Sequence, residues 1–67
     1  MKEIEMVEFE DVTITEERPL SIKCNFQDST VAWVPKSLIG DDSEVWGDGD
    51  EGTLVIPEWY AIKEGLV

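Results

Sequence analysis

The regular alternation of apolar and polar residues over 20–27 is the clearest structural signal in the chain. Leu20, Ile22, Cys24 and Phe26 alternate with polar residues. A period of two is typical of a strand with one buried face. The pattern predicts a strand over residues 20–27 with Cys24 in the core, where a thiol acts as a small apolar filler. A reactive thiol is the less favoured interpretation.

Residues 4–15 also have strand spacing, but the phase of the pattern changes twice. The apolar residues form three pairs, each with a spacing of two: Ile4 and Met6, Val7 and Phe9, Val12 and Ile14. A change of phase turns side chains to the other face unless a residue is inserted, so we expect bulges near residues 6–7 and 10–11. A short helix over residues 2–9 is the alternative.

Turn-forming residues separate the remaining segments. Pro19 lacks a backbone donor and biases Arg18 away from helix, so residues 16–19 are expected to form a turn. A second turn is predicted at 28–29. The β-branched and aromatic residues of 30–34 favour a third strand that ends at Pro35. Residues 38–39 are too short a run to assign, and 40–43 read as a loop.

The glycine-rich segment 47–52 lies between an apolar pair, Val45 and Trp46, and the apolar run 54–56. Three glycines in six residues favour a turn, so we predict a hairpin here. The hairpin is expected to lead into a short helix that starts at Pro57 and ends before a left-handed Gly65.

Within that helix, Trp59, Ile62 and Leu66 recur at spacings of three and four. So short a helix is stable only when packed, and we expect this stripe, with Trp59 as a core residue, to lie on the sheet. The predicted fold is a single α+β domain over residues 1–67. It comprises a small twisted antiparallel sheet of four or five short strands, barrel-like in curvature, and one short C-terminal helix.

Composition narrows the possible functions. Sixteen acidic and five basic residues give a net charge of −11, which opposes direct binding to nucleic acid. Histidine is absent, Cys24 is the single cysteine, and a domain of 67 residues has little room for a catalytic cleft. We therefore expect no enzyme activity and no cofactor. No signal peptide or membrane span is recognised, which predicts a location in the host cell cytoplasm.

Thirteen of the acids lie in two blocks, residues 1–18 and 40–52. Carboxylates two residues apart on a strand recur at about 6.6 Å, which is comparable with phosphates along a nucleic acid strand of about 3.4 Å rise once lateral displacement is added. A basic nucleic-acid-binding channel is thus a suitable partner. The candidate partner-binding residues are Glu8, Glu10, Asp11, Asp41, Asp42, Glu44, Asp48, Asp50 and Glu51. A specific metal site at 48–52 is disfavoured, since the EF-hand ligand order is not met.

Four segments of the second half of the chain carry a resemblance: 33–39 (WVPKSLI), 41–45 (DDSEV), 52–61 (GTLVIPEWYA) and 63–66 (KEGL). They resemble small proteins of phages and mobile elements. A tiny, very acidic domain with this pattern also resembles the anti-CRISPR proteins, several of which mimic the charge of DNA. The shared residues are turn formers, tryptophans and a capped helix, and they imply no catalytic residue.

These observations lead to one functional hypothesis and one alternative. The protein is expected to be a phage-encoded inhibitor that occupies the DNA-binding site of a host defence complex, in particular a CRISPR effector subunit, by acidic mimicry. The alternative is a non-catalytic interaction or structural module whose acidity serves solubility.

Overall fold

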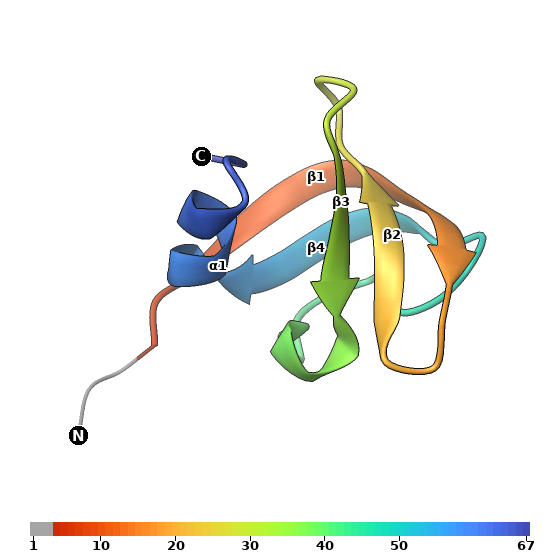
Figure 1. Cartoon of the computed structure of the whole chain (residues 1–67), viewed down its shortest axis with the longest axis horizontal. Coiled ribbons are helices and arrows are strands. Elements are labelled where there is room, and N and C mark those ends of the chain that lie inside the picture. Colours follow the sequence, from red (N-terminus) through yellow and green to blue (C-terminus); the bar gives the residue numbers. More distant parts are fainter. Residues whose placement is uncertain (1–3) are drawn as a thin grey trace.

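The computed structural model describes residues 4–67, in which four antiparallel strands form one sheet with a short helix at its end (Figure 1). The elements are β1 Met6–Glu17, β2 Ser21–Asn25, β3 Val31–Pro35, the 3-10 turn η1 Lys36–Leu38, β4 Glu51–Pro57 and α1 Glu58–Lys63. The strand order is β3-β2-β1-β4. The predicted α+β class is confirmed. The sheet is curved but is not closed into a barrel, since β3 and β4 each have one strand neighbour.

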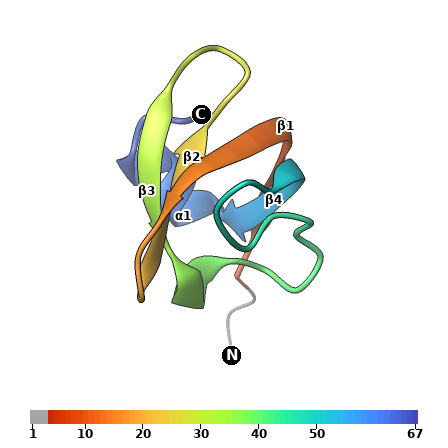
Figure 2. The same cartoon turned by 90° about the vertical axis from the view of Figure 1, so that its right-hand side faces the viewer.

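The long strand β1 is shared between two partners. It pairs with β4 from Met6 to Thr13, with Phe9 opposite Leu54, and with β2 from Thr13 to Glu17, with Ile14 opposite Cys24. Figure 2 shows β1 crossing the molecule diagonally, with β4 on one side and β2 and β3 on the other. Each half of β1 thus contributes its apolar residues to one core.

The pairing of β1 with β4 shifts between Phe9 and Val12, and Asp11 adopts a left-handed backbone with φ 55°. This confirms the irregularity expected at residues 10–11. The one expected at 6–7 is wrong, because the ladder runs without a shift from Met6 to Phe9. The second irregularity lies between Ile14 and Glu16, opposite β2. The alternative of a helix is wrong for residues 6–9, while residues 2–3 lie outside the described part.

Side chains from all four strands, from α1 and from the loop before β4 form the core, and the largest fully buried ones are Val12, Ile14, Ile22, Cys24, Val34, Val45, Leu54 and Ile56. The expected burial of Cys24 is confirmed, and loss of solvation raises the pKa of its thiol to about 12. Leu20, however, is 81% exposed. The strand begins at Ser21, not at the predicted residue 20. Pro19 and Leu20 belong to the preceding turn, which is closed by the bond from Arg18 N–H to Ser21 O at 2.8 Å.

The predicted hairpin is wrong, because Val45 and Trp46 belong to no strand. The loop containing them instead runs along the outer edge of β4. Gly40 N–H donates to Val55 O at 2.8 Å and Glu44 N–H donates to Thr53 O at 2.7 Å. Val45 is apolar because it is a buried loop residue. The strand that pairs with β4 is β1, which is far from it in sequence.

Ser43 completes this edge. Its buried hydroxyl accepts from Val55 N–H at 2.8 Å and donates to Val55 O at 3.2 Å. Free strand edges invite pairing with other chains, and covering them with a loop prevents it. The outward-facing groups of Thr53 and Val55 are therefore occupied within the molecule.

Helix α1 begins at Glu58, one residue after the predicted start, and Pro57 is its N-cap. Gly65 has φ 73°, and the bonds from Gly65 N–H to Ile62 O and from Leu66 N–H to Ala61 O form a Schellman motif. The predicted left-handed cap is thus confirmed.

The face that α1 buries differs from the prediction. Tyr60 and Ala61 are buried, whereas Trp59 and Ile62 are 52% and 59% exposed. Of the predicted stripe, only Leu66 is partly buried. A helix of six residues that starts where β4 ends takes its orientation from the strand, so spacing alone could not identify the packed face.

The hydroxyl of Tyr60 donates to Trp33 O at 2.6 Å and so links α1 to the edge of β3. Tyr60→Phe keeps the ring and leaves that carbonyl without its partner. We expect the free energy of unfolding in urea to fall by about 1 kcal/mol. Unchanged stability would show that this bond does not hold the helix to the sheet.

The bulge offers a second test of the fold. Asp11→Val and Asp11→Gly both remove the carboxylate, but only valine is disfavoured in the left-handed region. We expect the valine variant to be less stable than the glycine variant by about 1 kcal/mol or more in chemical denaturation. Equal stability would contradict a left-handed residue at this position.

Candidate functional site

The predicted acidic residues form two separate groups. The loop block consists of Asp41, Asp42, Glu44, Asp48, Asp50 and Glu51, and the strand block consists of Glu8, Glu10 and Asp11. The members of each block are close in sequence, but their carboxylates differ in their hydrogen bonds. Some carboxylates hold the backbone in place, and others face solvent.

Two members of the loop block stabilise the loops themselves. The Oδ2 atom of Asp50 accepts from Trp46 N–H at 2.8 Å and Gly47 N–H at 3.0 Å, and these two bonds lower its pKa. The Oε1 atom of Glu44 accepts from Thr53 N–H at 2.9 Å. These two carboxylates are engaged within the protein.

The other members of the loop block are exposed. Thr13 donates its hydroxyl to Glu51 over a long 3.4 Å, and within residues 4–67 no hydrogen bond or salt bridge engages the carboxylates of Asp41, Asp42 or Asp48. These last three are therefore the loop carboxylates that are free to meet a partner.

The strand block surrounds the bulge. Gln27 Nε2 donates to Asp11 Oδ2 at 2.8 Å and to Glu10 O at 3.3 Å, so the turn after β2 is tied to the bulged residues. The side chains of Glu8 and Glu10 have no such partner among the described residues, and both residues are exposed. They are the free carboxylates of this block.

A groove of about 430 Å³ lies beside these two glutamates. Its lining residues are Glu8, Phe9, Glu10, Phe26, Gln27, Asp28 and Leu66. Phe9 and Phe26 meet edge to face with ring centroids 5.1 Å apart. Hydrogen bonds from Thr30, first from its side chain and then from its backbone, lower the pKa of Asp28 and keep it ionised. The groove thus combines apolar walls with three carboxylates.

The groove is not predicted by the sequence pattern. Phe9 and Phe26 were expected only as strand residues, and Asp28 only as a turn residue. The alternating pattern places both phenylalanines on the buried side of their strands. No sequence signal shows that the turn after β2 and the penultimate residue Leu66 approach the first half of β1 at this point.

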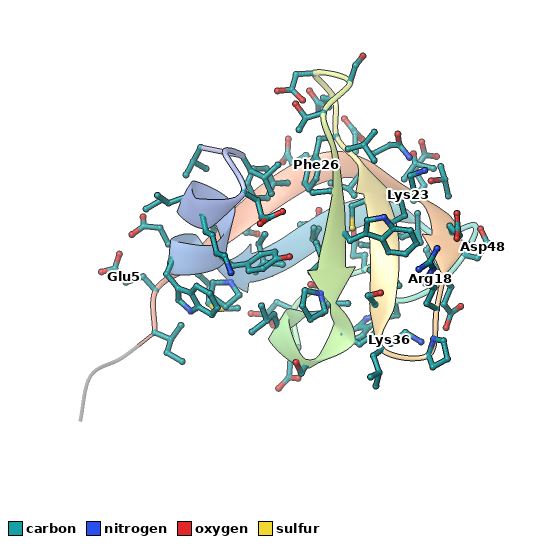
Figure 3. All side chains as sticks on the ribbon, viewed as in Figure 1. Glu5, Arg18, Lys23, Phe26, Lys36 and Asp48 are labelled. Atoms are coloured by element: carbon teal, nitrogen blue, oxygen red, sulfur yellow. The ribbon has the colours of Figure 1, made fainter. Side chains whose placement is uncertain are left out.

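The four basic residues of the described range are Arg18, Lys23, Lys36 and Lys63. Figure 3 places the first three around β2, at the opposite end of the molecule from Glu5, while Lys63 lies in the last turn of α1. Arg18 pairs with Glu16 at 3.5 Å and lies 4.6 Å from the ring centre of Trp33.

Lys36 pairs with Glu17 at 2.6 Å and is the main cause of the lowered pKa of that carboxyl group. The backbone N–H of Asp48 donates to the same Glu17 at 3.3 Å. Asp48 therefore lies close to this ion pair, whereas no Lys or Arg of residues 4–67 lines the groove with Glu8 and Glu10.

Comparison with known proteins identifies no relative of this chain, since no protein-family model, curated protein or solved structure matches it. Residues 4–67 contain no cluster of three or more potential metal-ligating side chains. Within the same range, no helix has the length and apolar character needed to cross a membrane.

The role of Asp50 gives a pH-dependent prediction. Its pKa is lowered in the folded state, so it contributes stability above its unfolded pKa of about 3.9, and this contribution is lost as the pH falls through the lower folded value. We expect Asp50→Asn to melt below the wild type at pH 7, with the difference closing in acid.

Asp48→Asn is the matched control, because it removes the same charge from an exposed carboxylate that makes no hydrogen bond within residues 4–67. It should melt close to the wild-type temperature, since it removes no hydrogen bond of the described residues and lowers the magnitude of the net charge. Identical melting temperatures of the two variants at pH 7 would show that Asp50 does not hold the loop.

Proposed function

We propose that the protein is a non-catalytic inhibitor that binds a basic, nucleic-acid-binding surface of a host defence complex, with a CRISPR effector as the foremost candidate. It would exclude DNA from that surface by presenting carboxylates in place of phosphates. The resemblance of residues 33–66 to proteins of phages and mobile elements supports the class of target. The exposed glutamates beside the groove, which no lysine or arginine of residues 4–67 engages, support the mode of binding.

The observation that carries the proposal is the uncompensated strand block. Glu8 and Glu10 are exposed beside a groove that no lysine or arginine of residues 4–67 lines, while Arg18 and Lys36 are paired with other acids. With a net charge of −11, the field of the protein would steer it rapidly to a cationic surface. The same field repels DNA itself.

Part of the acidity has a different role. Asp50 and Glu44 bind backbone N–H groups, so they count toward stability and not toward the binding surface. In the alternative function, the exposed loop acids Asp41, Asp42 and Asp48 serve solubility and bind no partner. The two interpretations differ in what happens when exposed charges are removed.

The test measures binding of labelled target DNA to a panel of purified, guide-loaded CRISPR effectors by fluorescence anisotropy, with increasing amounts of the protein. We expect the wild type to displace DNA from at least one effector. Glu8→Gln with Glu10→Gln should weaken this inhibition about tenfold or more, since close charge pairs at an interface contribute more than 1 kcal/mol. The difference should shrink at high salt.

Asp41→Asn with Asp42→Asn is the matched control, because it removes two charges from the exposed part of the loop block. It should change the inhibition less than the pair at Glu8 and Glu10. If the wild type displaces DNA from no effector in the panel, the inhibitor proposal fails. Equal losses from both pairs would show that only net charge matters.

A further inference from the structure

The first half of β1 has a backbone edge without a strand partner. The backbone groups of Thr53 and Val55 face the loop at Gly40 and Glu44, so the intervening Leu54 faces β1. In an antiparallel ladder successive residues face opposite edges. Since Phe9 lies opposite Leu54, the backbone groups of Met6, Glu8 and Glu10 face away from β4.

Strand β2 does not cover this edge. Its pairing with β1 begins at Thr13. The bulge at Asp11 bends β1 just before that point. Among the described residues, only Glu10 O has a partner at the edge, namely Gln27 Nε2. The edge at Met6 and Glu8 lies beside the groove, with the turn after β2 on one side and the C-terminal residues on the other (Figure 1).

The groove also supplies side-chain recognition. Phe9, Phe26 and Leu66 form apolar walls, while Glu8, Glu10 and Asp28 supply negative charge. Successive side chains of a strand point to opposite faces, so a strand added here would place one set of side chains beside Phe9 and the other beside the two glutamates. The complementary sequence has basic and apolar residues in alternation.

We propose that this groove is the docking site for an extended, basic segment of the partner protein, which adds as a strand to the free edge of β1 at Met6 to Glu10. The partner is the one assumed in the proposed function, and the inference rests on it. Strand addition combines backbone hydrogen bonds with pockets for alternate side chains. A second copy of this chain is disfavoured as occupant, since each copy carries a charge of −11.

The binding test uses a synthetic peptide of sequence TRVRVRT, titrated into isotope-labelled protein and followed by NMR. The amides of Met6, Glu8 and Glu10 and the signals of Phe9 and Phe26 should shift together on binding. The peptide TEVEVET should not bind, because its charge is reversed. Shifts confined to the loop block would overturn the proposal.

Backbone pairing is separated from charge attraction by N-methylating alternate residues of the basic peptide. One of the two N-methylation patterns removes the N–H groups that face β1 and should weaken binding at least tenfold, whereas the other should change it less. If both methylated peptides bind as tightly as the parent, the attraction is purely electrostatic and strand addition is wrong. This comparison requires no change to the protein.

On the protein side, Glu8→Pro removes the outward N–H, and Glu8→Gln removes only the charge. Because Glu8 N–H faces away from β4, the proline should leave the ladder with β4 intact. We expect the proline variant to bind the basic peptide more weakly than the glutamine variant. Equal binding by two folded variants would contradict pairing at this edge, and the methylated peptides decide the matter if the proline variant does not fold.

The two proposals can fail separately. Displacement of DNA from an effector without binding of the basic peptide would overturn the groove and leave the inhibitor. Binding of the peptide without any effect on DNA would support the groove and overturn the choice of target. A concentration-dependent dimer in sedimentation, abolished by Glu8→Pro, would assign the edge to a second copy and overturn the basic partner.

Discussion

The left-handed backbone of Asp11 determines how the sheet is built. The apolar residues Phe9 and Val12 are three positions apart, yet both contact the core, because the bulge between them inserts the extra residue that a strict alternation lacks. Aspartate tolerates this backbone better than most residues, and Gln27 holds its carboxylate. The bend allows one strand to pair with β4 along its first part and with β2 along its last part. The edge of the first half of β1 that faces away from β4 is therefore not paired with β2.

The strong negative charge is accommodated by dividing the carboxylates between internal and external tasks. A net charge of −11 on so small a domain opposes compaction. Asp50 and Glu44 offset part of this by binding backbone N–H groups in the loop that covers β4. Glu16 pairs with Arg18, and Glu17 pairs with Lys36. The carboxylates of Glu8 and Glu10, exposed beside the groove, have no partner among the described residues. A basic partner would therefore form its strongest charge interactions there.

The sequence predicted those features that depend on local pattern. The α+β class, the bulge at 10–11, the buried Cys24 and the cap at Gly65 follow from periodicity and from backbone preferences. The failures concern contacts between distant segments. Val45 is apolar because a loop buries it, and Trp59 is exposed because the end of β4 orients the helix. The groove could not be predicted either, since it depends on where Phe9, Phe26 and Leu66 meet in space.

The central claim is that β1 carries a free edge at Glu8 next to a paired residue, Phe9. Amide hydrogen exchange of the free protein, measured by NMR under native conditions, tests this most directly. The account predicts that the Phe9 amide, which faces β4, exchanges slowly, while the Glu8 amide exchanges orders of magnitude faster. Protection of Glu8 as strong as that of Phe9 would show that the edge is already covered and would contradict the account.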